Sequence, residues 1–342
     1  MALHNRISNR LLKEKLKKLA DDRITISFYK YHPIVEPGEL RNIFYRDLEN
    51  LKVMGRIYLA HEGINAQISV PKDMLDVFRS YLYGISFLNG VRLNVAVDDN
   101  GKSFFKLKIL VRKKIVADGL DDKGFDVTKG GVHVNAKEFN ELANDPNTVI
   151  VDMRNHYESE VGHFKNAICP DVDTFREELV VVEKLLHDSR DKNIVMYCTG
   201  GIRCEKASAW MRHRGFKNVF QLDGGIIEYA KQVREQDLEN KFVGKNFVFD
   251  ERLGERISKD IISVCHQCGK PCDDHTNCKN DGCHLLFIQC SECAEEFNGC
   301  CSPECRKVLA LPVEQQKTIR KGINKGRQVF KKGRSENIKF RA

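Results

Sequence analysis

The sequence predicts a multidomain α/β protein, and three observations support this fold class. The chain has 342 residues, more than one hydrophobic core usually holds. In its middle part, apolar runs alternate with helical stretches, which is typical of a parallel sheet covered by helices. Of the 13 cysteines, all but three lie between Cys265 and Cys305, which sets off a cysteine-rich module. We expect a basic N-terminal helix (1–22), an α+β domain (23–116), a linker (117–131), an α/β domain (132–237), the cysteine-rich module (238–312) and a basic tail (313–342).

The α+β domain is predicted to be a ferredoxin-like sandwich. The segment ITISFYKY predicts a strand because it is rich in β-branched and aromatic residues. Apolar residues at helical spacing predict a helix over 37–51, and a proline opens a second helix over 71–83. RIYLAHEGINAQISV predicts two strands around a turn at Glu62 and Gly63, and LNVAVDD and FKLKILVRKKIV supply further strands. The order β-α-β-β-α-β is that of a ferredoxin-like α+β sandwich.

The α/β domain contains three apolar runs, VIVDM, NIVMYC and VFQL, and a helical stretch follows each of them. This pattern predicts a parallel sheet with helices on both faces. The second run is the most informative, because the loop CTGGIR joins it directly to the helix EKASAWMRHR.

That loop is predicted to hold a reactive cysteine. Its two glycines let the backbone curl so that amide N–H groups point inward, and Cys198 begins the loop at a strand end, where α/β sheets place ligands. The amides, the helix N-terminus and the charge of Arg203 all favour a thiolate, which lowers the pKa of Cys198 and activates it. The alternative is an inert buried cysteine, which the glycines and Arg203 argue against.

Two other cysteines lie in the same domain. Cys204 follows Arg203 on the first turn of the helix. It is either a resolving thiol for an oxidised Cys198 or a small residue that packs the helix, and the frequency of buried free cysteines favours packing. Cys169 precedes Pro170 in a loop, and we assign it no role.

The cysteine-rich module is predicted to bind zinc in a structural role. Two Cys-x2-Cys knuckles, at Cys265 and at Cys290, together supply the four thiolates of a tetrahedral ion. The other six cysteines, with His266, His275 or His284, are candidates for a second site, and spacing alone leaves their grouping open. Reduced or disulfide-linked cysteines without metal are the alternative, but the segment has few large apolar groups and needs a staple. The candidate ligands are Cys265, Cys268, Cys272, Cys278, Cys283, Cys290, Cys293, Cys300, Cys301 and Cys305.

The charge distribution suggests a polyanionic partner. The net charge is +8 at pH 7, and the segment 102–114 contains no acidic residue. Its Lys106, Lys108, Arg112 and Lys113 are candidate RNA-binding residues, with Phe104 and Phe105 as aromatic surface beside them. A solvated strand face is the alternative for this segment alone, but the basic helix and the tail, with ten Lys or Arg and one Glu over 317–342, favour RNA.

The compartment is expected to be the cytoplasm. No stretch approaches the ~20 apolar residues of a membrane span, and the N-terminal segment lacks the apolar core of a secretory signal. In a reducing cytosol the cysteines are not expected to form disulfides. We expect no membrane partner, and we expect no DNA partner. The sequence does not indicate an oligomeric state.

Residues 132–230 resemble the rhodanese homology domain. VIVDMRNHYESEVGHFKNAI is similar to its first signature, CTGGIR to its active-site loop and GFKNVFQLDGGIIEYA to its closing signature. The resemblance implies a persulfide on the loop cysteine, held by the loop amides and the arginine. Asp152 and Arg154 match residues that brace the loop, and we interpret Glu158 and His163 as structural groups. By position, the loop roles fall to Cys198, Thr199, Gly200, Gly201, Ile202 and Arg203.

The whole architecture resembles the tRNA uridine hydroxylases. The segments LAHEGINAQISV, CTGGIR and CHQCGKPCDDHTNC carry the resemblance, which covers about residues 22–305. It implies oxygen-dependent hydroxylation of C5 of uridine 34 in tRNA, with molecular oxygen as co-substrate and dependence on Cys198. No flavin, haem, nicotinamide or 2-His-1-carboxylate iron site is evident, so thiolate addition to C6 of uracil or a sulfenic-type oxygen carrier are the hypotheses. A sulfurtransferase with a persulfide on Cys198, and a non-enzymatic RNA-binding adaptor, are the alternatives.

Overall fold

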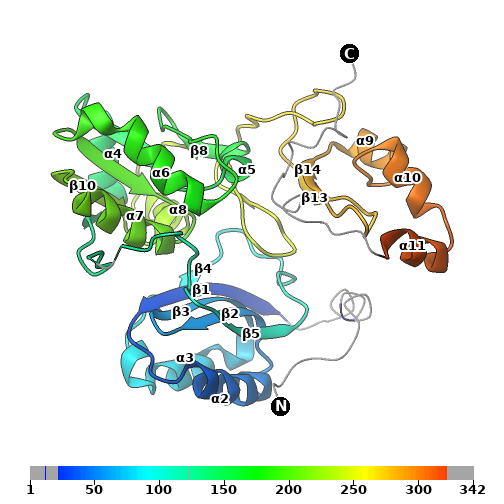
Figure 1. Cartoon of the computed structure of the whole chain (residues 1–342), viewed down its shortest axis with the longest axis horizontal. Helices are drawn as coiled ribbons and strands as arrows, with labels where there is room; N and C mark the ends of the chain where they lie inside the picture. The colour runs from blue at the N-terminus through cyan, green and yellow to red at the C-terminus, as the bar shows by residue number, and fades with distance from the viewer. Residues whose placement is uncertain (1–11, 13–21, 123, 322–342) are drawn as a thin grey trace.

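The computed structural model describes residue 12 and residues 22–122 and 124–321. An N-terminal domain, a central domain and a C-terminal part follow one another along the chain (Figure 1). The predicted basic helix over 1–22 and the tail beyond residue 321 lie outside the described residues. Within the described part of the chain, no helix combines the length and apolar character that crossing a membrane requires.

The N-terminal domain has the predicted ferredoxin-like order. Its five-stranded sheet runs β4-β1-β3-β2-β5, in which β1 and β2 both pair antiparallel with β3 and the added edge strand β5 runs parallel to β2. The second helix begins later than predicted, because β3 continues through Pro71 and a 3-10 turn, η1 (Lys72–Met74), intervenes. The other elements are β1 (Arg23–Tyr31), α2 (Pro37–Asn50), β2 (Met54–Ala60), β3 (Gly63–Pro71), α3 (Leu75–Tyr83), η2 (Ser86–Leu88), β4 (Asn94–Val95) and β5 (Leu107–Val111).

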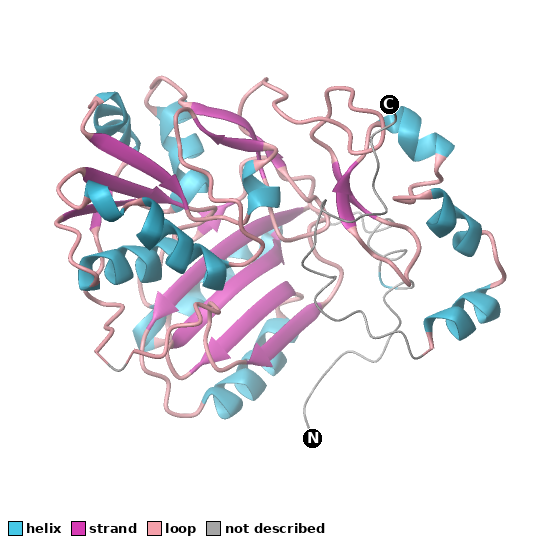
Figure 2. Cartoon of the chain, turned by 45° about the horizontal axis from the view of Figure 1, so that its top comes forward, coloured by secondary structure: helices cyan, strands magenta, loops and turns pink. Residues whose placement is uncertain are grey.

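The two faces of this sheet differ in character. Ile26, Phe28, Ile57 and Ile68 are buried on the face that α2 and α3 cover. The alternate positions point to the opposite face, which carries no helix and is mostly polar (Figure 2). Because β3 alternates strictly, Asn65, Gln67 and Ser69 all lie on this helix-free face.

The central domain is the predicted parallel α/β sheet. Its strand order is β6-β10-β9-β7, and all three pairings are parallel. Helices α4 and α8 pack on one face and α6 and α7 on the other, so each face has its own hydrophobic core. The elements are β6 (Val132–Val134), α4 (Ala136–Asn144), β7 (Thr148–Asp152), α5 (His156–Ser159), α6 (Phe175–Leu185), η3 (His187–Ser189), β9 (Asn193–Tyr197), α7 (Ile202–His213), β10 (Asn218–Leu222) and α8 (Gly225–Glu235).

The C-terminal part starts on the central domain and ends as a separate module. Strand β11 (Phe242–Asn246) pairs with β8 (Gly162–Phe164) of the central domain and with β12 (Glu255–Arg256). The module itself contains β13 (His275–Asn277), β14 (Leu286–Ile288), α9 (Ser291–Glu296), α10 (Pro303–Leu309) and α11 (Val313–Arg320). Helix α11 occupies the start of the predicted basic tail (313–342), where the sequence analysis names no helix. Pro312 precedes its first residue, and ion pairs such as Lys317–Glu314 support it.

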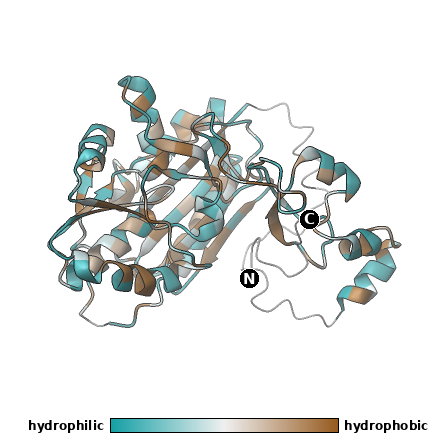
Figure 3. Ribbon diagram, turned by 90° about the horizontal axis from the view of Figure 1, so that it is seen from above, coloured by the Kyte–Doolittle hydropathy of each residue, from teal (hydrophilic) through white to brown (hydrophobic). Residues whose placement is uncertain are grey.

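The module has little apolar surface to bury. Its helices are mostly hydrophilic, whereas strands of the other two parts carry many hydrophobic residues (Figure 3). The small core within the module consists of Leu285, Phe287 and four buried cysteines. A second cluster is shared with Tyr157 and Val161 of the central domain. Since so small a core stabilises a fold weakly, the cysteines are the main candidates for holding this module together.

Candidate active site

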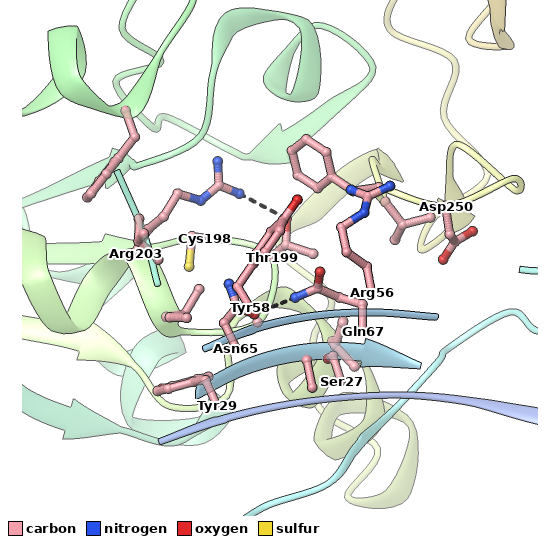
Figure 4. Close-up of a pocket in the computed structure, with 18 of the residues that line it drawn as sticks. Ser27, Tyr29, Arg56, Tyr58, Asn65, Gln67, Cys198, Thr199, Arg203 and Asp250 are labelled. Atoms are coloured by element: carbon pink, nitrogen blue, oxygen red, sulfur yellow. Dashed lines mark hydrogen bonds between the residues drawn. The ribbon is translucent and has the colours of Figure 1, made fainter. Parts of the chain in front are cut away.

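A cavity of about 1040 Å³ lies between the N-terminal and central domains (Figure 4). The helix-free face of the N-terminal sheet forms one wall, and the loop between β9 and α7 forms the opposite wall. The segment Val248–Asp250, which follows β11, closes a third side. Lining residues on the sheet are Ser27, Tyr29, Arg56, Tyr58, Asn65 and Gln67, and on the loop they are Cys198, Thr199, Gly200, Ile202 and Arg203.

The loop holds the Cys198 sulfur at the boundary of this cavity. Only 1% of the residue is exposed, and the backbone N–H of Gly201 donates to its Sγ at 3.2 Å. Gly201 has φ +97°, a left-handed conformation that favours glycine and turns the chain into α7. Gly225 allows the start of α8 to lie against the loop, because a Cβ there would be 2.5 Å from the carbonyl oxygen of Cys198. This close approach explains the second glycine of the DGG sequence, which sequence reasoning did not single out.

The surroundings of Cys198 favour its thiolate. Burial raises the pKa of the thiol and is the largest single influence. It is outweighed by a hydrogen bond from the Cys204 thiol, the positive charge of Arg203 and the backbone N–H groups of both residues, which together lower the pKa of Cys198 to about 6. A pKa of about 6 favours the thiolate over the thiol at neutral pH.

Cys204 is the neutral partner of this pair. It is fully buried in the core beneath the loop, so it does pack the helix as predicted. Burial and the hydrogen bond with the neighbouring Cys198 thiolate raise its own pKa well above the usual value. Sequence reasoning missed the resulting role of Cys204 as a hydrogen-bond donor to the reactive sulfur.

Replacing Cys204 therefore has a predictable effect on its neighbour. Cys204→Ala removes a donor that favours the thiolate, so the pKa of Cys198 is expected to rise from about 6. The measurement is the pH dependence of Cys198 alkylation by iodoacetamide, whose midpoint should move to higher pH. Cys204→Ser keeps a hydroxyl donor and should leave the midpoint close to that of the unmodified protein. An unchanged midpoint in Cys204→Ala would contradict this assignment.

Arg203 is fixed by a buried carboxylate. Its Nη1 and Nη2 donate to Glu158 at 2.7 and 2.9 Å, and both side chains are almost completely buried. Its Nη2 also contacts Thr199 Oγ1 at 3.3 Å. The guanidinium therefore braces the loop while its charge still acts on Cys198. Glu158 thus has the structural role that the sequence suggested.

Asp152 and Arg154 form the expected buried contact behind the loop. Arg154 donates to both carboxylate oxygens of Asp152, at 2.8 and 2.6 Å, and to the carbonyl oxygen of Gly162 at 2.6 Å. The hydroxyl of Tyr197, the residue before Cys198, donates to Asp152 at 2.7 Å. These bonds join the ends of β7 and β9 and so fix the position from which the loop starts.

The N-terminal domain contacts the loop and its helix directly. Tyr29 Oη donates to Glu205 at 2.9 Å, and Asn94 Nδ2 contacts the carbonyl oxygen of Gly200 at 3.4 Å. Lys206 is 1% exposed and bonds Glu62 of the β2–β3 turn at 2.9 Å and Asp118 of the linker. These contacts between domains could not be derived from the local pattern of the sequence.

The predicted RNA-binding residues lie on and beside the edge strand β5. Lys108 is exposed and stands in register with Arg56, which lines the cavity. Partial desolvation by its neighbours, and then the positive charges of Lys106, Arg56 and Arg112, lower the pKa of Lys108. Lys113 is also exposed. These cations form a basic edge that leads to the cavity through Arg56, a residue that the sequence analysis did not include.

The aromatic part of that prediction is only half right. Phe104 is 7% exposed and belongs to the interior, so it offers no surface to a base. Phe105 is partly exposed and lies under Lys106, whose Nζ is 5.6 Å from the ring centroid. The aromatic residues that line the cavity include Tyr29, Tyr58 and Phe249.

Eight of the ten clustered cysteines form two groups of four. Their sulfur atoms lie within 4.8 Å of one another in each group. Cys272 and Cys300 belong to neither group, which corrects the ten-residue ligand set. Cys272 packs in the apolar cluster beside the first group, and Cys300 is fully buried among the residues around the second. The first group consists of Cys265, Cys268, Cys290 and Cys293, as the two knuckles predicted, and the second of Cys278, Cys283, Cys301 and Cys305.

The histidines of the module take no part in these groups among the described residues. His266 instead contacts Glu160 of the central domain, with 2.8 Å between Nε2 and Oε1. Each group therefore offers four sulfur donors, a full tetrahedral set that would leave no open position for a substrate on an ion held there.

Comparison with known proteins agrees with this architecture. A model described as UPF0176 acylphosphatase like domain matches residues 23–115, one for the rhodanese-like domain matches 135–232, and one described as Rhodanase C-terminal matches 243–306. The chain is 58% identical over 97% of its length to the tRNA uridine(34) hydroxylase of Enterobacter sp. (strain 638), of which it covers 95%. It is 57% identical, with the same coverage, to the proteins of that name from Photorhabdus laumondii and Escherichia fergusonii. On this similarity over nearly the whole length, the chain belongs to the tRNA uridine(34) hydroxylase family.

Proposed function

We propose that this protein hydroxylates C5 of uridine 34 in tRNA, with molecular oxygen as co-substrate and Cys198 as the group that attacks the base. The observation that carries the proposal is the position of this sulfur. It is a thiol whose pKa is lowered to about 6, and it lies at a cavity whose opposite wall is polar and contains two tyrosines. A cavity of about 1040 Å³ has room for a nucleotide turned out of its stack. Relatives that match nearly the whole chain are called tRNA uridine(34) hydroxylase, and this similarity favours the same activity.

The chemistry follows from the electron distribution of uracil. A thiolate can add to C6 of the C5–C6 double bond, and the electron pair that is displaced makes C5 nucleophilic toward oxygen. One oxygen atom then forms the C5–O bond and the other leaves as water, with two electrons supplied by a cellular reductant. Loss of the C5 proton and of Cys198 restores the double bond and yields 5-hydroxyuridine. The role of the chain is to keep the sulfur anionic and the base in contact with it.

The basic edge supports tRNA as the substrate. Lys106, Lys108, Arg112 and Lys113 lie on or beside one strand, and the cation next to them in register, Arg56, belongs to the cavity. Phosphates of an anticodon loop held along this edge would leave a neighbouring base close to the cavity mouth. We place this activity in the cytoplasm, where tRNA and reduced thiols are available.

The direct test uses purified protein, tRNA that carries U34, a reductant and isotopically labelled molecular oxygen. The expected product, detected by mass spectrometry of nucleosides, is 5-hydroxyuridine with one labelled oxygen atom. The same reaction without oxygen should leave the uridine unmodified. Thiolated uridine in place of the hydroxylated base would favour the sulfurtransferase alternative, and an unmodified base under all conditions would contradict the proposal.

We further propose that each group of four cysteines holds one structural zinc ion. The donor set fits, because four sulfur atoms within 4.8 Å suit a tetrahedral ion that prefers thiolates. Backbone N–H groups already point at sulfur: that of Cys290 contacts Cys265 Sγ at 3.4 Å, and that of Cys301 contacts Cys278 Sγ at 3.5 Å. Such bonds stabilise thiolates and orient them, as is usual around a metal.

Zinc binding has a quantitative test. Elemental analysis of the purified protein should find one zinc per group, two per chain. Cys293→Ser should lose one of them and lower the thermal midpoint, because metal binding supplies folding free energy to a module with little core. Cys272→Ser is the matched control, since this cysteine lies in the same module but outside both groups. A protein without zinc, or equal zinc loss in the control, would contradict the assignment.

A further inference from the structure

The polar wall opposite Cys198 is built from two rows of side chains that cross three strands. In one row, Ser27 and Arg56 flank Gln67, each directly opposite it in the strand register. In the other row, Tyr29 and Tyr58 flank Asn65 in the same way. All six residues line the cavity, and Figure 4 shows Asn65 and Gln67 on the sheet, across from the loop of Cys198. Both belong to β3. The sheet therefore presents two amides and a guanidinium to whatever Cys198 attacks.

The orientation of both amides is fixed by hydrogen bonds. Asn65 Nδ2 donates to the carbonyl oxygen of Ile115 at 3.2 Å, and since a carbonyl can only accept, this side must be the nitrogen. The Asn65 Oδ1 oxygen consequently faces Gln67 and accepts from Gln67 Nε2 at 2.5 Å. Gln67 is thereby forced to present its Oε1 oxygen on the other side.

These two hydrogen bonds leave the Gln67 Oε1 oxygen as an acceptor in the cavity. The Oδ1 of Asn94, opposite Ser27 on β4, also has no hydrogen-bond partner within the described part of the chain, but this atom is buried. Asn65 is 9% exposed, and both ends of its amide are engaged in the hydrogen bonds with Ile115 and Gln67. Gln67 is only partly buried, so its Oε1 oxygen can meet a ligand. Beside it, Arg56 supplies a permanent donor. The wall thus offers the Gln67 oxygen as an acceptor and the Arg56 guanidinium as a donor, side by side. A ligand that carries an N–H next to a carbonyl oxygen would complement both.

We propose that Gln67 recognises the target base by accepting a hydrogen bond from the N3–H of uracil. Uracil carries this N–H between two carbonyl oxygens, either of which can face Arg56. Cytosine has no hydrogen at N3, so its N3 lone pair would face the lone pair of the Gln67 oxygen. Two acceptors facing each other are strongly disfavoured in a desolvated site. The inference rests on the proposed function and names Gln67 as a residue that determines its base specificity.

The test compares tRNA that carries uridine at position 34 with the same tRNA that carries 3-methyluridine there. In the unmodified protein, the methyl group removes the donor and collides with the Gln67 amide, so hydroxylation should fall steeply. Gln67→Ala should lower kcat/KM for the uridine substrate by about 10- to 100-fold. Because it also makes room for the methyl group, Gln67→Ala should hydroxylate the 3-methyluridine substrate better than the unmodified protein does. These opposite effects on the two substrates are not expected from general damage to the fold.

Ser27→Ala is the matched control, because Ser27 lies beside Gln67 on the same wall and is given no part in recognition. It should keep the substrate preference of the unmodified protein. The pH midpoint of Cys198 alkylation should be the same in Gln67→Ala as in the unmodified protein. An unchanged preference in Gln67→Ala, or an equal loss on both substrates with a shifted midpoint, would overturn the inference. If the unmodified protein hydroxylates neither substrate, the proposed function fails instead.

Discussion

Cys198→Ser is expected to abolish hydroxylation of uridine 34, with a loss of at least about a thousandfold. A serine hydroxyl stays protonated at neutral pH, whereas burial of Cys198 is outweighed by donors that lower its pKa to about 6. The amides and Arg203 that favour the thiolate therefore have no anion to stabilise in the variant. The measurement is the content of 5-hydroxyuridine in tRNA after incubation with each protein.

The matched control is Cys169→Ser. Cys169 lies in the same domain, but burial raises the pKa of its thiol to about 12, so it is not a nucleophile at neutral pH. This variant should retain activity. The rate of the unmodified protein should rise with pH through about 6 and level off above it, because the thiolate is the reactive form. Product formed by Cys198→Ser at a rate close to that of the control would exclude a nucleophilic role for the sulfur.

Lys206→Met is expected to lower the free energy of unfolding by about 3–5 kcal/mol. Lys206 and Asp118 are each 1% exposed at the side chain, and Glu62 lies against the same ammonium group. Removing the cation leaves Glu62 and Asp118 without their common partner. Among the described residues, the buried Asp118 carboxylate then keeps only the half-exposed Lys114 and the backbone N–H of Leu120 as donors. Because Lys206 stands on α7 directly after the reactive loop, the variant should also loosen the contact between the domains and reduce hydroxylation.

Urea denaturation measures this effect, and Lys217→Met is its control. Lys217 pairs with Asp191 at the surface, with side-chain exposures of 72% and 81%. Exposed pairs contribute little, so the control should change the free energy of unfolding by less than about 0.5 kcal/mol. Equal effects of the two substitutions would show that Lys206 does not connect the domains as described.

Local patterns predicted most of the fold. The strand, loop and helix around Cys198 are marked by an apolar run, two glycines and a helical segment, and the structure has all three in place. The ferredoxin-like order was equally evident, because β-branched runs mark its strands and apolar residues at helical spacing mark its first helix. Helix α11 was missed because its residues are mostly polar and none is buried, so the sequence has no apolar periodicity there.

What could not be predicted depends on pairs of residues far apart in the sequence. The two knuckles identified one group of four cysteines, but nothing local indicates that Cys272 faces an apolar cluster while Cys283 and Cys305 meet. Likewise, Gln67 and Cys198 share a cavity only because the helix-free sheet face packs on the central domain. The geometry of the loop was therefore predictable, whereas the polar wall opposite it was not.

Alkylation of Cys198 as a function of pH, with and without tRNA, tests most directly that an anionic sulfur faces the substrate. The expected midpoint is about 6, and tRNA with uridine at position 34 should slow the reaction at every pH by occupying the cavity. A midpoint near 8.5, the ordinary value for a free cysteine, together with equal rates in the presence and absence of tRNA, would contradict the account.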